Sequence, residues 1–238
     1  MTISKFTYDK KWFGLGIPNA DLTAPWQKSN LETDKFYPDL SGSIDYKLNS
    51  QGYRDVDWTP DQLNNSIWCV GHSDVAGIGV DYDNIWPVLL EKSTGIKTIN
   101  LGVIGGSWDT ISRVLSSALT THKPKFVFIQ ATTRDRREYI TNERQQVVLP
   151  SMEDDWQVDL NFWKFIDEEN SQYSLEKNIT IIDLACKVAG VNYLIFDFAD
   201  RWDTIRKYPA ADGKHIGAVP HQMISEYLTA ELKKHQLD

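Results

Sequence analysis

The stretch SIWCVGHSDVAGIGV, residues 66–80, decides the fold. Its four consecutive apolar residues, 67–70, predict a strand that is covered on both faces, and the glycines that follow predict a strand-to-helix turn. Ser73 lies in this turn, at the carboxyl end of the strand, where a hydroxyl can be exposed and backbone N–H groups can face developing negative charge. Taken alone, a serine in such a turn is more often only a turn residue.

Downstream of this stretch, short apolar runs alternate with amphipathic segments, which predicts β-α units and a parallel sheet. The expected strands are 67–70, 98–101, 126–129, 179–182 and 193–196, and the expected helices are 85–92, 110–121, 155–173 and 219–235. Residues 141–154 are expected to form a long loop. The pattern predicts an α/β, flavodoxin-like fold of three layers with a five-stranded parallel sheet, which binds ligands at the carboxyl ends of its strands.

Residues 1–65 have a different character, with many turn formers and aromatic residues and no helical period. We expect an irregular, aromatic-rich N-terminal arm that packs on the main domain, residues 66–238, or on a partner, because exposed aromatic side chains in this number would be poorly soluble. The arm makes a homo-oligomer, or assembly into a particle, one expectation for this chain.

The net charge of −8 at pH 7 and the pI of about 5.1 disfavour nucleic acid and membrane surfaces as partners, because binding to phosphates relies on clustered Lys and Arg. The two cysteines, Cys69 and Cys186, are expected to be buried free thiols. Neither a signal peptide nor a membrane span is recognisable, which predicts a cytoplasmic protein, with association with a virion as an alternative. We expect no metal ion and no cofactor.

A second informative segment, ADGKHIG at residues 211–217, precedes the last expected helix. Asp212 and His215 are three positions apart on one turn, so the carboxylate can fix the imidazole tautomer while the other ring nitrogen faces a nucleophile. That arrangement suits a general base acting on Ser73. By itself, Asp-x-x-His is also common as a helix cap or a surface pair.

The order and spacing of these segments resemble the SGNH hydrolases, also called the GDSL-like lipase/acylhydrolase superfamily. NLGVIGGS at residues 100–107 resembles the second conserved block of that family, and NSQGYR at 49–54 resembles a lead-in found in a subset of its members. The resemblance covers about residues 49–235. It implies a serine esterase that removes acetyl or another small acyl group from a carbohydrate-like substrate.

The resemblance also implies a role for each matching residue. Ser73 would be the nucleophile, His215 the general base, and Asp212 the group that orients His215. The backbone N–H groups of Ser73 and Gly105 would form the oxyanion hole, with Gly106 next in line.

Two positions depart from the family pattern. His72 replaces the aspartate that precedes the nucleophile, and a neutral imidazole can supply one donor and one acceptor there. After the third strand, QATTRD at 130–135 lacks the asparagine that donates to the oxyanion. Thr132 or Thr133 could donate a hydroxyl hydrogen bond instead, and Arg134 a charged one.

Further residues are candidates for holding the substrate. They are Thr133, Arg134, Gly106 and Trp108, with Arg54, Arg136 and Arg137 as additional candidates for clamping an anionic group. The two departures leave an alternative hypothesis open, in which the chain keeps the fold as a catalytically weak or inactive binding or structural module, such as a phage or viral component.

Overall fold

The computed structural model describes residues 44, 46–140, 145–148, 167–197, 207–211 and 215–235. Asp212 and residues 1–43 of the predicted arm lie outside the described residues. None of the described helices is both long and apolar enough to span a membrane.

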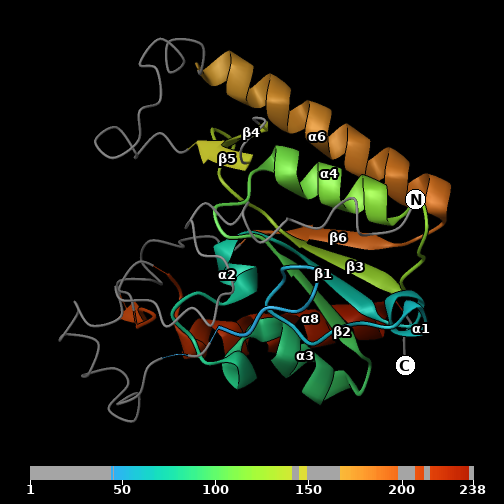
Figure 1. The fold of residues 1–238 in the computed structure, drawn as a ribbon, viewed down its shortest axis with the longest axis vertical. Coiled ribbons are helices and arrows are strands. Elements are labelled where there is room, and N and C mark those ends of the chain that lie inside the picture. Colours follow the sequence, from blue (N-terminus) through green and yellow to red (C-terminus); the bar gives the residue numbers. More distant parts are fainter. Residues whose placement is uncertain are drawn as a thin grey trace.

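A parallel sheet forms the centre of the molecule (Figure 1). In the described residues it has four strands in the order β2-β1-β3-β6. Their bounds are β1 Ile67–Gly71, β2 Thr98–Gly102, β3 Phe126–Gln130 and β6 Tyr193–Phe196. The strands β2 and β3 lie on either side of β1. The order in which strands are added to the sheet therefore reverses at β1, as in flavodoxin-like folds. The predicted α/β, flavodoxin-like fold class is confirmed, and four of its five expected strands are present in the described residues.

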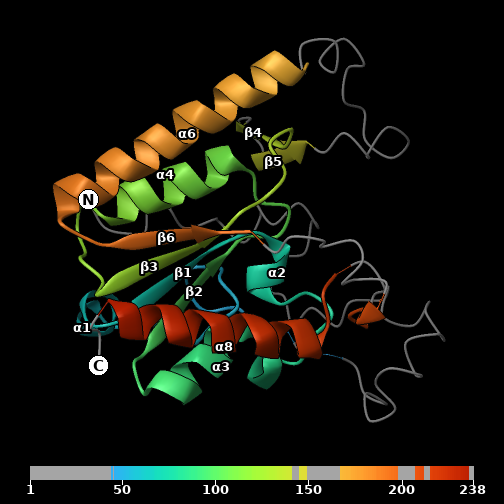
Figure 2. The ribbon, with the colours of Figure 1, turned by 180° about the vertical axis from the view of Figure 1, so that it is seen from behind.

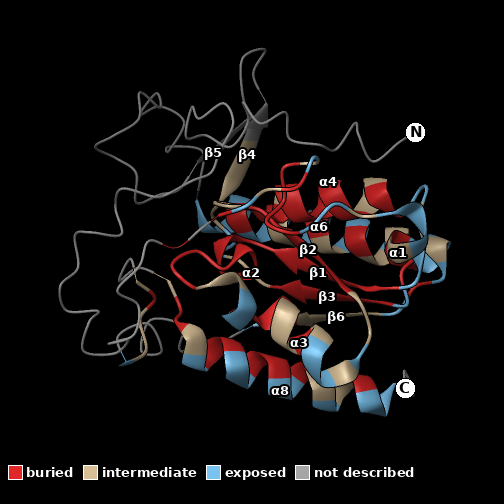
Figure 3. Ribbon diagram, turned by 60° about the horizontal axis from the view of Figure 1, so that its bottom comes forward, coloured by how far each residue is buried: buried red, intermediate tan, exposed pale blue. Residues whose placement is uncertain are grey.

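Helices cover both faces of the sheet (Figures 1 and 2). In the described residues the helices are α1 Pro60–Asn64, α2 Ser73–Ala76, α3 Trp86–Thr94, α4 Trp108–Ala118, α6 Glu168–Ala189 and α8 Ala218–Lys234, and a 3₁₀ turn, η5, lies at Tyr82–Asn84. Alternate residues of β1 point to opposite faces: Trp68 and Val70 pack in the cluster with α4 and α6, and Ile67 and Cys69 in the cluster with α3 and α8. Figure 3 shows β1, β2 and β3 buried along their length.

The strand expected at residues 179–182 is wrong, because these residues lie within α6. The buried face of α6 carries Ser171, Ser174, Asn178, Ile182 and Cys186, which recur at helical spacing. Tertiary contacts on that face outweigh the strand preference of the local isoleucines. Of the helix expected at 155–173, residues 155–166 lie outside the described residues, and the described helix continues to Ala189.

A polar contact fixes α6 against α4 inside this interface. Ser112 Oγ donates to Asn178 Oδ1 at 2.6 Å. Asn178 Nδ2 donates to Asp109 Oδ1 at 2.8 Å and to the carbonyl of Ser174 at 2.9 Å. The amide of Asn178, although only 1% exposed, therefore has partners for both its oxygen and its nitrogen.

The loop expected at 141–154 is also wrong in part. Residues Gln145–Val148 form β5, which pairs antiparallel with β4, Arg137–Ile140. The two strands form a separate sheet beside α4 and α6 (Figure 1). The remainder of 141–154 lies outside the described residues.

Candidate active site

The turn that carries Ser73 is packed too tightly for side chains at its glycines. A Cβ on Gly71 would lie 2.6 Å from Val75 Cγ2, and one on Gly102, at the end of β2, would lie 2.3 Å from the backbone nitrogen of Ala76. Ser73 is the first residue of α2 and is 4% exposed. These glycines let β2 approach the turn closely and so fix where Ser73 stands.

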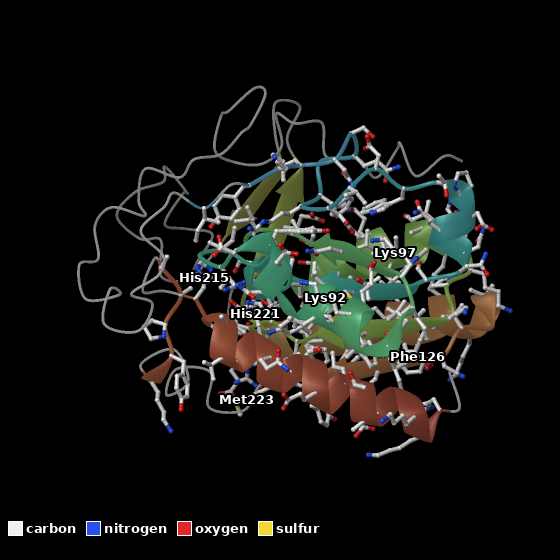
Figure 4. The ribbon with its side chains drawn as sticks, turned by 90° about the horizontal axis from the view of Figure 1, so that it is seen from below. Lys92, Lys97, Phe126, His215, His221 and Met223 are labelled. Atoms are coloured by element: carbon white, nitrogen blue, oxygen red, sulfur yellow. The ribbon has the colours of Figure 1, made fainter. Side chains whose placement is uncertain are left out.

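His215 reaches Ser73 from the far end of the chain. Its Nε2 atom lies 2.9 Å from Ser73 Oγ. An isolated antiparallel bridge between Pro209 and Ile216 holds this segment, and the N–H of Ala210 donates to the carbonyl of His215 at 2.8 Å. Figure 4 labels His215 just before α8 and His221 on that helix. The two residues that the sequence pairs as nucleophile and base are within hydrogen-bond reach of each other.

His72 joins the ends of two strands. Its Nε2 lies 3.0 Å from the carbonyl oxygen of Ala131, the residue after β3. A carbonyl only accepts, so Nε2 carries the proton and Nδ1 accepts, at 3.4 Å, from the N–H of Asp74. The imidazole thus supplies one donor and one acceptor, as expected for its neutral form, and both of its nitrogens contact backbone atoms.

The loop after β2 lies directly against the serine turn. Gly105 has φ +74°, and the N–H of Gly106 donates to the carbonyl of Val103 at 2.9 Å, which closes a tight turn of the kind that requires a left-handed third residue. A Cβ on Gly106 would lie 3.1 Å from the carbonyl oxygen of Gly71. Among the described residues, no acceptor is bound by the backbone N–H of Ser73 or of Gly105. Both are N–H groups that the sequence analysis assigns to an oxyanion hole.

The candidates Thr132, Thr133 and Arg134 lie in the segment after β3 and differ in their contacts. Thr132 Oγ1 donates to the carbonyl of Gly106 at 3.2 Å, whereas Thr133 is exposed. Arg134 Nη2 pairs with Glu168 Oε1 at 2.9 Å, with both side chains largely exposed. The structure therefore brings Thr132 to the loop of Gly106 and directs the guanidinium of Arg134 to α6.

Trp108 is not an open stacking surface. It is 5% exposed and packs in the core cluster between the sheet and the α4–α6 layer. Its indole N–H donates to the carbonyl of Thr132 at 2.9 Å. The sequence suggested a substrate contact for Trp108, but the side chain is buried and supports the segment after β3.

Solved structures resemble this chain. One, assigned to the G-D-S-L family of lipolytic proteins, is from Desulfitobacterium hafniense DCB-2, with 14% identity, a TM-score of 0.40, and coverage of 70% of this chain and 99% of that one. Another is a carbohydrate acetylesterase family member from Sinorhizobium meliloti, with 14% identity, a TM-score of 0.37, and coverage of 71% and 98%. The sequence matches no protein-family model and no curated protein.

Arg54 has a role that the sequence did not disclose. It is 2% exposed, and its guanidinium donates to the carbonyls of Ala76 and Gly77 and, at 2.8 Å, to that of Val80. These carbonyls belong to the last residue of α2 and to the loop that follows it. Arg54 is therefore committed to holding the serine turn, and the hypothesis that it clamps a substrate anion is wrong. The NSQGYR motif singled out Arg54 but not the carbonyls that it contacts.

His221 was also missed as a site neighbour. It is fully buried, and its Nδ1 accepts from the N–H of Trp86 at 3.0 Å, so that α8 is tied to the start of α3. Its Nε2 has no hydrogen-bond partner among the described residues. Burial lowers the pKa of His221 to about 4, with Asp74 opposing the shift and Arg54 and His215 adding to it. In the described ranges, no group of three or more His, Cys, Asp or Glu is placed to hold a metal ion.

Proposed function

We propose that this chain is a serine ester hydrolase of the SGNH type that removes a small acyl group, such as acetyl, from a carbohydrate-like substrate. The observation that carries the proposal is the 2.9 Å separation of His215 Nε2 and Ser73 Oγ at the carboxyl end of β1. The N–H groups of Ser73 and Gly105, which bind no backbone acceptor among the described residues, support it, because an acyl-transfer site needs donors beside its nucleophile.

The proposed reaction has two halves. Ser73 Oγ attacks the carbonyl carbon of the ester while His215 Nε2 takes the hydroxyl proton, and the oxyanion is received by the N–H groups of Ser73 and Gly105. His215 then gives the proton to the leaving alcohol, and an acyl-serine remains. A water molecule, deprotonated by His215, attacks the acyl-serine, and His215 returns that proton to Ser73 Oγ as the acid is released. In this scheme, Asp212 orients His215 through Nδ1–H.

Thr132 has a conditional part in this scheme. Its hydroxyl proton is directed at the carbonyl of Gly106, at 3.2 Å, so donation to an oxyanion requires rotation about its side-chain bond.

A fluorophosphonate probe tests the proposal, since it phosphonylates only an activated serine. The wild type is expected to be labelled and to hydrolyse p-nitrophenyl acetate, and Ser73→Ala is expected to lose both properties. Ser116→Ala, a serine on α4 whose hydroxyl donates to the carbonyl of Arg113, is the matched control and is expected to behave as the wild type. A folded wild type that is neither labelled nor active would overturn the proposal and favour a binding or structural module.

A further inference from the structure

Two of the three arginines that follow β3 contact α6. Arg134 pairs with Glu168, and Arg137 binds its own segment and the first turn of α6. Arg136 differs from both, because its Nη1 donates to the carbonyl of Gly106 at 3.4 Å, a long hydrogen bond, in the loop that offers the Gly105 N–H. Arg136 is partly buried. One cation of this cluster is therefore directed at the oxyanion side of the candidate site.

From this arrangement we propose that Arg136 is a positioning residue for ester hydrolysis. It holds the Gly106 carbonyl, keeps the Gly105 N–H in place, and adds a positive charge near the developing oxyanion. This charge would compensate for the oxyanion-binding asparagine that residues 130–135 lack. The inference rests on the proposed function and deepens it. The cation favours the transition state because that state, unlike the neutral ester, carries negative charge.

The backbone that carries Arg136 is braced from within. Arg137 Nη1 donates to the carbonyl of Arg134 at 2.7 Å and to that of Arg136 at 3.0 Å. Its Nη2 donates to the carbonyl of Asn170 at 3.3 Å and to Ser171 Oγ at 3.4 Å, both on α6. A guanidinium that binds several carbonyls at once fixes the course of the segment, so Arg136 is presented from a defined backbone.

The far side of the segment is anchored to α4. Arg113 donates to Glu138 through Nε at 2.8 Å and through Nη2 at 2.7 Å, and Thr110 Oγ1 donates to the same carboxylate at 3.1 Å. The side chain of Glu138 is 5% exposed. A buried bidentate ion pair has strong geometric preferences. The contacts of Glu138 therefore fix the start of β4 relative to α4.

Contacts at Gly106 connect this braced segment to the nucleophile. A Cβ on Gly106 would lie 3.5 Å from His72 Cα, so the loop is packed against the residue that precedes Ser73. The Gly106 carbonyl also accepts from Thr132 Oγ1 at 3.2 Å, which gives it a neutral donor as well as a charged one. Removal of Arg136 takes away the charge and one of these two donors, whereas Thr132→Val takes away only the neutral donor.

The test compares kcat and KM for p-nitrophenyl acetate in a set of variants. Arg136→Met and Arg136→Gln remove the charge, and we expect kcat to fall about 10- to 100-fold with KM nearly unchanged, somewhat less than the loss of a direct oxyanion donor. Arg136→Lys keeps the charge and should recover most of kcat. Thr132→Val should lower kcat less than Arg136→Met. Lys92→Met, which removes an exposed cation paired with Asp83, controls for net charge and should leave both constants unchanged.

The rate of fluorophosphonate labelling gives a second measurement that needs no turnover, and it should fall in parallel with kcat. An effect confined to KM, an unchanged kcat in Arg136→Met, or equal losses in the Lys, Gln and Met variants would each overturn the role of the charge. Because the Lys and Gln variants are compared directly, the test survives poor folding of the Met variant. A wild type that is labelled and active, with Arg136 variants that match it, sinks this inference alone, whereas an inert wild type removes the proposed function and this inference with it.

Discussion

Acidification should destabilise the protein through His221. The unfolded imidazole has a pKa of about 6.5. The pKa of His221 in the folded state is lowered to about 4, mainly because the ring is fully buried. The unfolded state therefore binds the proton first as the pH falls. Stability is fully present above pH 6.5 and is lost as the pH falls toward 4. Between pH 7 and pH 5, linkage gives a loss of about 2 kcal/mol, at about 1.4 kcal/mol per pKa unit.

Urea denaturation at pH 7 and pH 5 measures this loss, and His221→Asn is the comparison, since an asparagine oxygen can accept the Trp86 N–H without titrating. The variant should be less stable at pH 7 because the smaller side chain leaves a gap. Its stability should nevertheless change about 2 kcal/mol less between the two pH values than that of the wild type. Other histidines and carboxylates titrate in both proteins and cancel in the difference. Equal pH dependence in the two proteins would refute the reasoning.

Two further substitutions test the packing of the serine turn. Gly102→Ala places a methyl 2.3 Å from the Ala76 nitrogen, and we expect a loss of about 1–3 kcal/mol in chemical denaturation together with slower fluorophosphonate labelling; an unchanged midpoint would contradict the close approach. Arg54→Met leaves buried carbonyls without their donor, at about 1–3 kcal/mol each, so thermal unfolding should shift strongly downward; a variant as stable as the wild type would show that these carbonyls do not depend on Arg54.

The strands of the central sheet were predictable because their burial is two-sided. Residues 67–70 and 126–129 are apolar runs, and nearly all of their side chains are 0% exposed. A continuous apolar run therefore predicts a strand that is covered on both faces. The flavodoxin-like class of the fold was predictable from the same pattern, since alternation of strands and helices admits few topologies.

Residues 179–182 show where this logic fails. Ile179, Thr180, Ile181 and Ile182 have the composition of a strand, but only Ile182 is fully buried and Ile181 is 38% exposed. The buried face of the helix is marked mainly by small polar residues such as Ser174 and Asn178, which carry no hydrophobic period. A helix that packs through serine and asparagine cannot be recognised from apolar spacing.

The candidate site divides in a similar way. Ser73 and His215 were paired from the sequence because each lies next to a strand or helix end with a recognisable motif, and their atoms are in contact. The destinations of the arginines could not be predicted, because Arg54 and Arg136 both contact backbone carbonyls, and a carbonyl has no sequence signature. The role of Asp212 stays a prediction.

The contact between Ser112 and Asn178 makes the site sensitive to events far from it. If α6 slid by one turn, about 5.4 Å, along α4, the buried amide of Asn178 would lose its partners, at a cost of about 1–3 kcal/mol. The first turn of α6 is also where Arg137 is attached, through Asn170 and Ser171. A shift of α6 along its own axis would therefore move the segment that follows β3. A substitution at Asn178 is therefore expected to disturb the α4–α6 interface and, through the position of α6, the alignment of the segment that follows β3.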